Sequence, residues 1–219
     1  MKHLAISLLA GVAALGFASS TYAADLIIEQ PAEVGVVDVS GNWDGVYVGA
    51  FAGYGWGSAD QEITDDIFTG DTLDLTGWFI GLTAGANFTV SDGIVAGIVG
   101  DIAWSDISGF DDDYDTSVDI DWFGSLRGKL GFDGGAFLPY LTAGLAVAGA
   151  TIDYDPDVDS NTHIGWTAGA GVEFAVADNM SIDLLYRYSD YGTQTYVVDP
   201  DADVSLTAHT IQLGLNFRF

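Results

Sequence analysis

The sequence predicts an all-β protein, an eight-stranded antiparallel up-and-down transmembrane β-barrel. The first observation is the alternation in the last seventeen residues, where the apolar residues at the end of the chain share one parity: Ile211, Leu213, Leu215, Phe217 and Phe219. A period of two over this length indicates a strand with one apolar and one polar face. The second observation is that 49% of residues are hydrophobic, yet no apolar segment after the N-terminus approaches the ~20 residues of a membrane helix. The third is a strict alternation of short turns with long acidic loops.

The same two-faced pattern recurs in seven earlier segments. We predict strands at residues 44–57, 73–90, 94–105, 117–132, 137–152, 162–176, 180–191 and, last, 203–219. Short turns rich in Gly, Asp and Asn follow every second strand, at residues 91–93, 133–135 and 177–179. The other connections are longer and acidic: 58–72, a loop around 111–115, 153–161 and 192–202.

Aromatic residues stand at both ends of the predicted apolar face, and Ile120 is expected on the same face. Those near the long loops are Trp56, Trp104, Trp122 and Tyr188, and those near the short turns are Phe88, Phe132, Phe137, Phe174 and Phe219. Two such girdles are typical of a lipid-facing band in an outer-membrane barrel. Backbone groups in lipid must all be paired, so the sheet has to close. An even strand number puts both barrel termini on the short-turn, periplasmic side and the acidic loops outside.

The first 23 residues have the features of a secretory signal peptide. Lys2 supplies a positive charge, residues 4–18 are an apolar run too short to span a bilayer, and residues 21–23 are a small-residue cleavage site. A buried or membrane helix is the alternative. Residues 24–42 lack alternation and are expected to form a periplasmic lead-in, and residues 43–219 the barrel domain. The chain contains no Cys, so disulfides do not hold the exported fold together.

The charge balance is strongly acidic and its few cations are placed selectively. The chain has 32 acidic residues and a formal net charge of −27, which argues against nucleic acid as a partner. The four basic residues after the signal all fall on the polar parity of their strands, where a charge avoids lipid. We predict a polar network in the lumen that is formed by Asp101, Arg127, Lys129, Glu173, Asp183, Arg187, Gln212 and Arg218, with Tyr140 and Asn216 hydrogen bonding among them.

Two interpretations of this network remain open. In the first the charges neutralise one another and fill the bore, since eight strands leave an interior just wide enough for side chains. In the second they line a narrow gated conduit and set its ion selectivity. A catalytic carboxylate pair is not favoured, because no cleft or nucleophile accompanies the acids. The prediction is therefore a non-enzymatic protein.

Other candidate sites are weaker. Four alternating acids invite a calcium interpretation, although the segment lacks the Gly and Glu of an EF-hand loop, and a solvated acidic loop is the alternative: Asp153, Asp155, Asp157 and Asp159. His163 is expected on the inward face near the outer end of the barrel and His209 on the outward face, as rim or belt histidines, with haem or metal ligation as the alternative. We predict no cofactor.

The chain resembles the small alphaproteobacterial outer-membrane β-barrel proteins, often called porin-family or outer membrane protein beta-barrel domain proteins. The resemblance starts at residues 43–57 (WDGVYVGAFAGYGWG) and covers nearly the whole mature chain. Further matching motifs, in family order, are residues 100–101 (GD), 124–131 (GSLRGKLG), 138–140 (LPY), 165–173 (GWTAGAGVE) and 209–219 (HTIQLGLNFRF).

The resemblance implies one eight-stranded barrel related in architecture to the OmpA membrane domain, in the outer membrane of a Gram-negative bacterium. It also implies that Phe219 is the signal for the barrel-assembly machinery. Val99 stands where members often carry Glu, and Phe51 takes an inward position that is usually polar. Both departures predict a drier bore.

The predicted function is a structural, envelope-integrity and surface-interaction barrel whose lumen is plugged by ion pairs. Its expected partners are outer-membrane lipid, lipopolysaccharide and the barrel-assembly machinery, with divalent cations at the acidic loops. Two alternatives are a low-conductance cation-preferring porin and, from what the family resemblance implies, a surface protein that binds haemin or host ligands.

Overall fold

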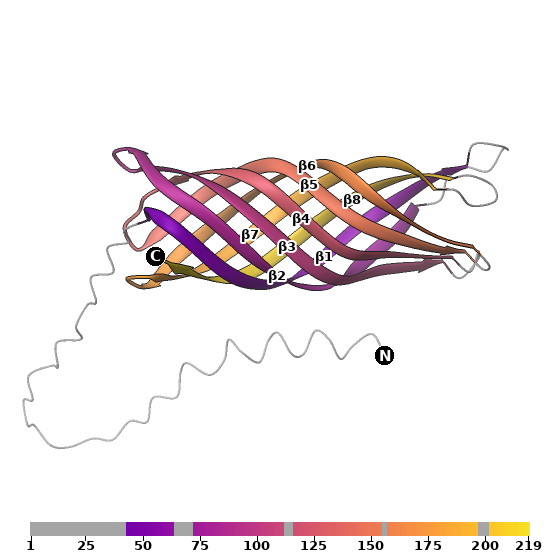
Figure 1. Cartoon of the computed structure of the whole chain (residues 1–219), viewed down its shortest axis with the longest axis horizontal. Helices are drawn as coiled ribbons and strands as arrows, with labels where there is room; N and C mark the ends of the chain where they lie inside the picture. Colours follow the sequence, from indigo (N-terminus) through magenta and orange to yellow (C-terminus); the bar gives the residue numbers. More distant parts are fainter. Residues whose placement is uncertain (1–42, 64–71, 112–115, 155–156, 197–201) are drawn as a thin grey trace, which may run out of the picture. The chain divides into compact units, whose positions relative to one another are not determined.

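The computed structural model describes residues 43–63, 72–111, 116–154, 157–196 and 202–219. Within these ranges eight antiparallel strands follow one another and close into a barrel (Figure 1), so the predicted fold class is confirmed. The strands are β1 (Gly45–Ile63), β2 (Thr72–Ser91), β3 (Ile94–Asp111), β4 (Thr116–Phe132), β5 (Phe137–Tyr154), β6 (Asp157–Ala177), β7 (Met180–Tyr196) and β8 (Ala202–Arg218). The predicted signal peptide and lead-in lie outside the described residues. No helix in the described part of the chain is long and apolar enough to cross a membrane.

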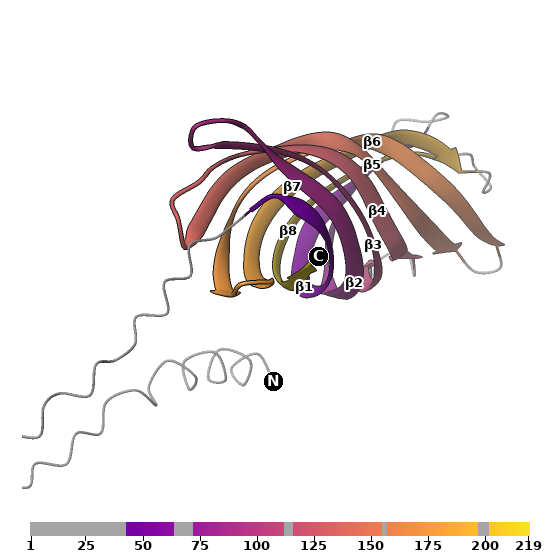
Figure 2. The ribbon, with the colours of Figure 1, turned by 60° about the vertical axis from the view of Figure 1, so that its left-hand side comes forward.

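Each strand pairs with its neighbours in sequence, and β1 pairs with β8 to close the ring (Figure 2). The closing register runs from Tyr47 opposite Arg218 to Ile63 opposite Ala202. The start of β1 and the end of β8 lie at the end of the barrel that carries the tight turns (Figure 1). At this end Gly93 and Gly135 adopt φ angles of 75° and 80°, which favour glycine. We call it the turn end, and the opposite end the loop end.

The strands are longer than a membrane requires. They contain 17 to 21 residues, whereas a tilted transmembrane strand needs about 9–11. Their loop-end portions also exceed the predicted bounds. β1 continues to Ile63, β3 to Asp111 and β7 to Tyr196, and β6 begins at Asp157. The acidic residues that suggested loops are therefore partly in strands, because an Asp on the water-facing side of a strand does not disturb its pairing.

The turn-end half of the barrel has apolar side chains outside and polar ones inside. Leu82, Leu145 and Leu213 are 55%, 64% and 59% exposed on the outer surface, whereas Arg127 and Asn216 are buried in the interior. Lipid-facing surfaces follow this inside-out pattern, since apolar side chains meet hydrocarbon at no cost while charges there cost about 2–4 kcal/mol.

The loop-end half has the reverse arrangement. Its interior is an apolar core in which Leu75, Ile107 and Leu206 are almost fully buried. The acids Asp74, Asp106 and Asp121 are exposed on its outer surface. This is the arrangement of a water-soluble barrel, with apolar side chains removed from water and charges left in it. The barrel therefore extends beyond the lipid-facing band as a solvated extension.

The predicted outward position of Ile120 is wrong. Ile120 is buried to 2% exposure in the apolar core, whereas Asp121 is exposed. The pairing registers shift between Ile120 and Trp122 towards β5, and between Trp104 and Ile107 towards β3. A β-bulge adds an unpaired residue and reverses the alternation beyond it. The bulge turns Val118 and Ile120 inward, so an uninterrupted period of two assigns them to the wrong face.

Aromatic side chains mark both borders of the lipid-facing band. Towards the loop end Trp56, Trp78, Trp104 and Trp166 are 39%, 65%, 55% and 49% exposed on the outer surface. Towards the turn end the exposed rings are Phe88, Phe132, Phe137, Phe174 and Phe219. Rings at these two levels are expected at the two membrane–water interfaces.

Gly53 leaves room for the ring of Phe79 in the interior. A methyl group at this position would overlap the carbonyl oxygen of Ile211 and the ring of Phe79. We expect Gly53→Ala to destabilise the barrel by about 1–3 kcal/mol, measured as the urea midpoint in lipid vesicles. Gly128→Ala is the control, because its methyl group would meet only the Ala143 oxygen, at 3.9 Å. Equal midpoints for the two variants would contradict this explanation.

Candidate functional site in the barrel interior

The eight predicted lumen residues come from β3, β4, β6, β7 and β8, and all of them lie in the interior. Their spacing along the strands separates the charged residues into two groups. One group surrounds Asp101 and the other surrounds Glu173. We call these groups the Asp101 cluster and the Glu173 cluster.

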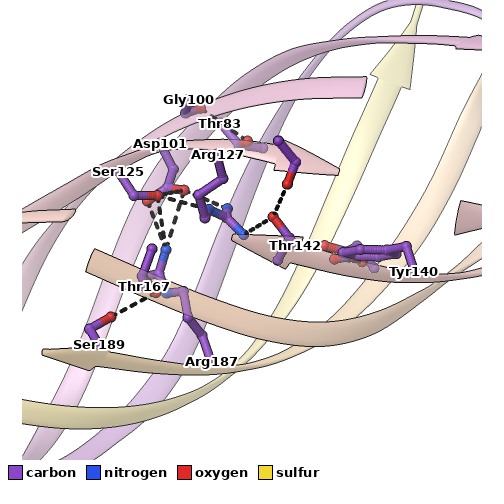
Figure 3. Close-up of polar contacts among 12 residues, drawn as sticks. Thr83, Gly100, Asp101, Ser125, Arg127, Tyr140, Thr142, Thr167, Arg187 and Ser189 are labelled. Carbon is purple, nitrogen blue, oxygen red and sulfur yellow. Dashed lines mark hydrogen bonds and ion pairs between the residues drawn. The ribbon is translucent and has the colours of Figure 1, made fainter. Parts of the chain in front are cut away.

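The Asp101 cluster joins one carboxylate to two guanidinium groups (Figure 3). Arg127 Nη2 lies 2.6 Å from Asp101 Oδ2, and Arg187 Nη1 lies 3.1 Å from Asp101 Oδ1. The Ser125 hydroxyl donates to Asp101 Oδ2 at 2.7 Å and accepts from Arg127 Nε at 2.8 Å. All three charged side chains are at most 3% exposed. Because Asp101 bridges both arginines, the cluster depends on a single carboxylate.

The network predicted from the sequence lacked Ser125. The sequence could have indicated it, because Ser125 stands two residues before Arg127 and the two side chains therefore share one face of β4. Ser125 was missed because it is uncharged, and the prediction was based on charged residues. Thr142, from β5, is a second hydroxyl of this kind: it accepts from Arg127 Nη1 at 3.5 Å and donates to the Gly128 carbonyl at 2.8 Å.

The Glu173 cluster lies nearer the turn end. Glu173 pairs with Lys129, accepts from the Ser181 hydroxyl at 3.0 Å and lies 3.8 Å from Arg218 Nη2. The Lys129 ammonium also lies 4.2 Å from the centroid of the Tyr140 ring, within cation–π range. Its charge is therefore satisfied by a carboxylate on one side and an aromatic face on another.

Asp183 differs from the other two acids. It accepts a hydrogen bond of 2.8 Å from the Tyr140 hydroxyl, and no ion pair is described for it within 4.0 Å. Among the described side chains, Gln212 Oε1 and Asn216 Oδ1 are buried without a hydrogen-bond partner. These two atoms and Asp183 line a cavity of about 20 Å³. That volume holds about one water molecule, which the polar lining suits.

The turn end of the bore is covered by Trp43, a residue without a predicted role. Trp43 is 1% exposed, packs with Val95 and Leu138, and donates from Nε1 to the Gly135 carbonyl at 3.2 Å. The guanidinium carbon of Arg218 lies 5.0 Å from its ring centroid. Trp43 precedes the first strand, where no alternation indicates a face, so its position depends on tertiary packing.

Three phenylalanines begin the apolar core on the loop-end side of the Asp101 cluster. Phe79 lies between Phe51 and Phe123, with ring centroids 6.2 Å and 5.1 Å apart in edge-to-face geometry. Arg187 lies 5.4 Å from the Phe123 ring and connects the charges to this core. The described interior thus contains, in order from the turn end, Trp43, the Glu173 cluster, the Asp101 cluster and the apolar core.

The remaining predicted sites are the four acids of one connection, two histidines and the C-terminal residue. Asp153, Asp155, Asp157 and Asp159 lie outside the residues whose side chains the structure describes. His163 is fully buried in the loop-end half, and His209 lies on the outer surface beside Tyr186. Phe219 is 76% exposed, and its amide donates to the Val46 carbonyl at 2.9 Å. Among the side chains that the structure describes, no three His, Asp or Glu residues converge as metal ligands.

Comparison with known proteins gives consistent results. The family described as "Outer membrane protein beta-barrel domain" matches residues 10–219. The 25 kDa outer-membrane immunogenic protein of Brucella abortus is 33% identical over 222 residues, which cover 100% of both chains. The 22 kDa outer membrane protein of Rhizobium leguminosarum bv. viciae is 31% identical over 188 residues, 84% of this chain and 81% of that protein. Neisserial surface protein A has a similar fold, with a TM-score of 0.51 and 19% identity, covering 80% of this chain and 97% of that one.

Proposed function

Because the chain belongs to the outer membrane protein beta-barrel domain family and is a protein of the bacterial outer membrane, we propose that it is a non-enzymatic structural barrel with a closed bore. Its outer face is embedded in lipid, and its solvated extension presents a surface to the exterior. In this role the barrel supports the envelope and interacts through its exposed end, without moving solutes.

The main support for this proposal is that side chains fill the bore along its described length. Trp43 covers the turn end, two charge clusters follow, and the apolar core occupies the loop-end half. The cavity among the charges is about 20 Å³, room for about one water molecule rather than a water column. An ion crossing the apolar core would lose its hydration without finding polar partners, which is strongly unfavourable.

The surface role is supported by the polarity of the solvated extension and by the relatives. The exposed acids Asp74, Asp106 and Asp121 give the extension a surface that suits divalent cations and the phosphates they bridge. We infer lipopolysaccharide and outer-membrane lipid as partners on this basis, and the barrel-assembly machinery through the terminal Phe219. The Brucella relative is described as immunogenic, which supports a surface-directed role here.

Planar-bilayer recording of the refolded mature protein tests the closed bore. We expect no stable conductance steps in potassium chloride, because no continuous polar path crosses the apolar core. Phe79→Gly combined with Phe123→Gly removes two rings of that core and serves as the matched variant that should begin to leak. Reproducible steps from the unaltered protein would overturn the proposal in favour of a low-conductance porin, whose cation or anion preference the reversal potential would then give.

A further inference from the structure

An aromatic cluster on the outer surface contains a histidine at its centre. His209 of β8 stacks on Trp56 of β1, with ring centroids 5.7 Å apart and planes inclined by 11°. Tyr188 of β7 lies 5.0 Å from His209, and Trp166 of β6 lies 5.5 Å from Tyr188. Tyr186 of β7 lies 6.1 Å from His209 and completes the His209 cluster. The Trp56, Tyr186 and Trp166 side chains remain 39%, 43% and 49% exposed.

The imidazole of His209 has a defined hydrogen-bonding role. Tyr186 Oη lies 2.7 Å from His209 Nδ1. If the phenol donates to Nδ1, the neutral ring carries its proton on Nε2 and offers an N–H donor there. The lysine and arginine side chains of the described barrel are all in the interior. His209 is therefore the only basic side chain on the described outer surface.

The outer surface differs between the two sides of the barrel. One step above the His209 cluster, towards the loop end, stand the hydroxyls of Ser58 and Thr207, 3.2 Å apart. Two described carboxylates also stand in this sector: Asp60 accepts from Thr72 at 2.7 Å, and Asp190 accepts from the Gly192 amide at 3.0 Å.

On β2 to β4 the girdle consists of tryptophans without a base. Exposed carboxylates stand above Trp78, Trp104 and Trp122, at Asp74, Asp106 and Asp121. The two sectors thus occupy the same level of the membrane with different chemistry. Both present rings and carboxylates, and Asp121 accepts from Thr151 at 2.8 Å, but among the described residues only the sector around His209 adds an imidazole to its rings.

We propose that the His209 cluster binds the saccharide headgroup of an outer-leaflet glycolipid, lipopolysaccharide. A sugar ring has an apolar C–H face that packs on an aromatic face, and a polar edge that exchanges hydrogen bonds with hydroxyl and N–H groups. An imidazole N–H can also donate a hydrogen bond to a hydroxyl or phosphate of such a headgroup, which an aromatic ring face alone cannot do. The inference rests on the proposed function, because it requires the loop-end girdle to lie at the level of the outer leaflet.

The test measures lipopolysaccharide binding to the refolded mature protein in a non-ionic detergent. Bound ligand at a free concentration c stabilises the folded protein by RT ln(1 + c/Kd), so the rise of the unfolding temperature along a titration gives the affinity. We expect Trp56→Leu and His209→Leu to weaken binding about tenfold, as removal of a central contact does at other interfaces. Trp104→Leu is the matched control, because Trp104 is an exposed girdle tryptophan on β3 and is not part of the His209 cluster. Its affinity should equal that of the unaltered protein.

Each outcome decides the proposal. Trp56→Phe keeps an aromatic face and should retain most of the affinity, which separates ring stacking from a folding defect. Equal weakening by Trp104→Leu, or no weakening by Trp56→Leu, would overturn the proposal, and so would equally tight binding of phosphatidylglycerol micelles. Heat-modifiable gel migration verifies that each variant is folded. The conductance of the same preparations is measured in parallel. It tests whether the bore is closed, whereas the titration tests glycolipid binding, so the two proposals can fail independently.

Discussion

Replacing Asp101 by leucine is expected to destabilise the barrel by about 3–5 kcal/mol, because two buried guanidinium groups then lose their shared partner. Arg127 and Arg187 both contact this carboxylate, and both side chains are at most 3% exposed. Without Asp101 the two like charges face each other in a bore with little access to water. Urea unfolding in lipid vesicles, followed by tryptophan fluorescence, measures the loss.

Two further variants sharpen this prediction. Asp106→Leu changes an exposed acid on the same strand and is expected to shift stability within about 0.5 kcal/mol. Combining Asp101→Leu with Arg127→Met and Arg187→Met removes the whole triad, and it should recover much of the lost stability, since apolar replacement of a buried ion network is often neutral or stabilising. A single Asp101→Leu variant as stable as the unaltered protein would contradict the pairing geometry.

Phe79→Ala is the second change with a large expected effect. The ring is 4% exposed and is enclosed by Phe51 and Phe123. Its removal leaves a cavity that rigid neighbouring strands cannot close, for a loss of about 3–5 kcal/mol. The urea midpoint in vesicles again gives the size of the effect.

Phe88→Ala is the matched control for this cavity. Phe88 belongs to the same strand, but its ring is 52% exposed at the turn-end girdle. Lipid chains fill the space that this ring leaves, so no cavity forms and the loss should be much smaller. If both variants lose the same stability, the apolar core does not contribute as the packing implies.

The turn-end half of the fold follows directly from the sequence, because a single rule governs it. Leu213, Leu215 and Phe217 alternate with Gln212, Gly214 and Asn216, and the environment on each side of the sheet is uniform: lipid outside and a filled bore inside. An alternation with a period of two then assigns every side chain to the lipid-facing or the bore-facing side of the sheet. The tight turns at Gly93 and Gly135 are equally local, since they depend on glycine at a positive φ.

The loop-end half does not follow in the same way. There Leu75 and Leu206 point inward and Asp106 outward, so alternation persists while its meaning is reversed. Alternation cannot show where lipid ends and water begins. The bulge at Asp121 adds a second difficulty, because one extra residue exchanges the faces and leaves no mark in composition.

For the interior, parity alone identified the charged residues but not their partners. Which acid meets which base depends on the stagger between strands: Asp101 and Arg187 are 86 residues apart and come from β3 and β7, which are not neighbours in the sheet. Trp43 depends on the same three-dimensional closure. Contacts across a bore are set by the barrel as a whole, so the local sequence does not contain them.

The reversal of polarity along the strands has a consequence for the height at which the barrel sits. On β3 the outward residues change from Trp104 to Asp106 within one step along the same face, about 7 Å of strand. Drift towards the periplasm would carry carboxylates into hydrocarbon, and drift away from it would bring leucines into water. A shift of the barrel by a few ångströms along the membrane normal is therefore unfavourable in either direction. The positions of these side chains fix the depth of the barrel in the membrane and the height to which its loop end projects from the lipid.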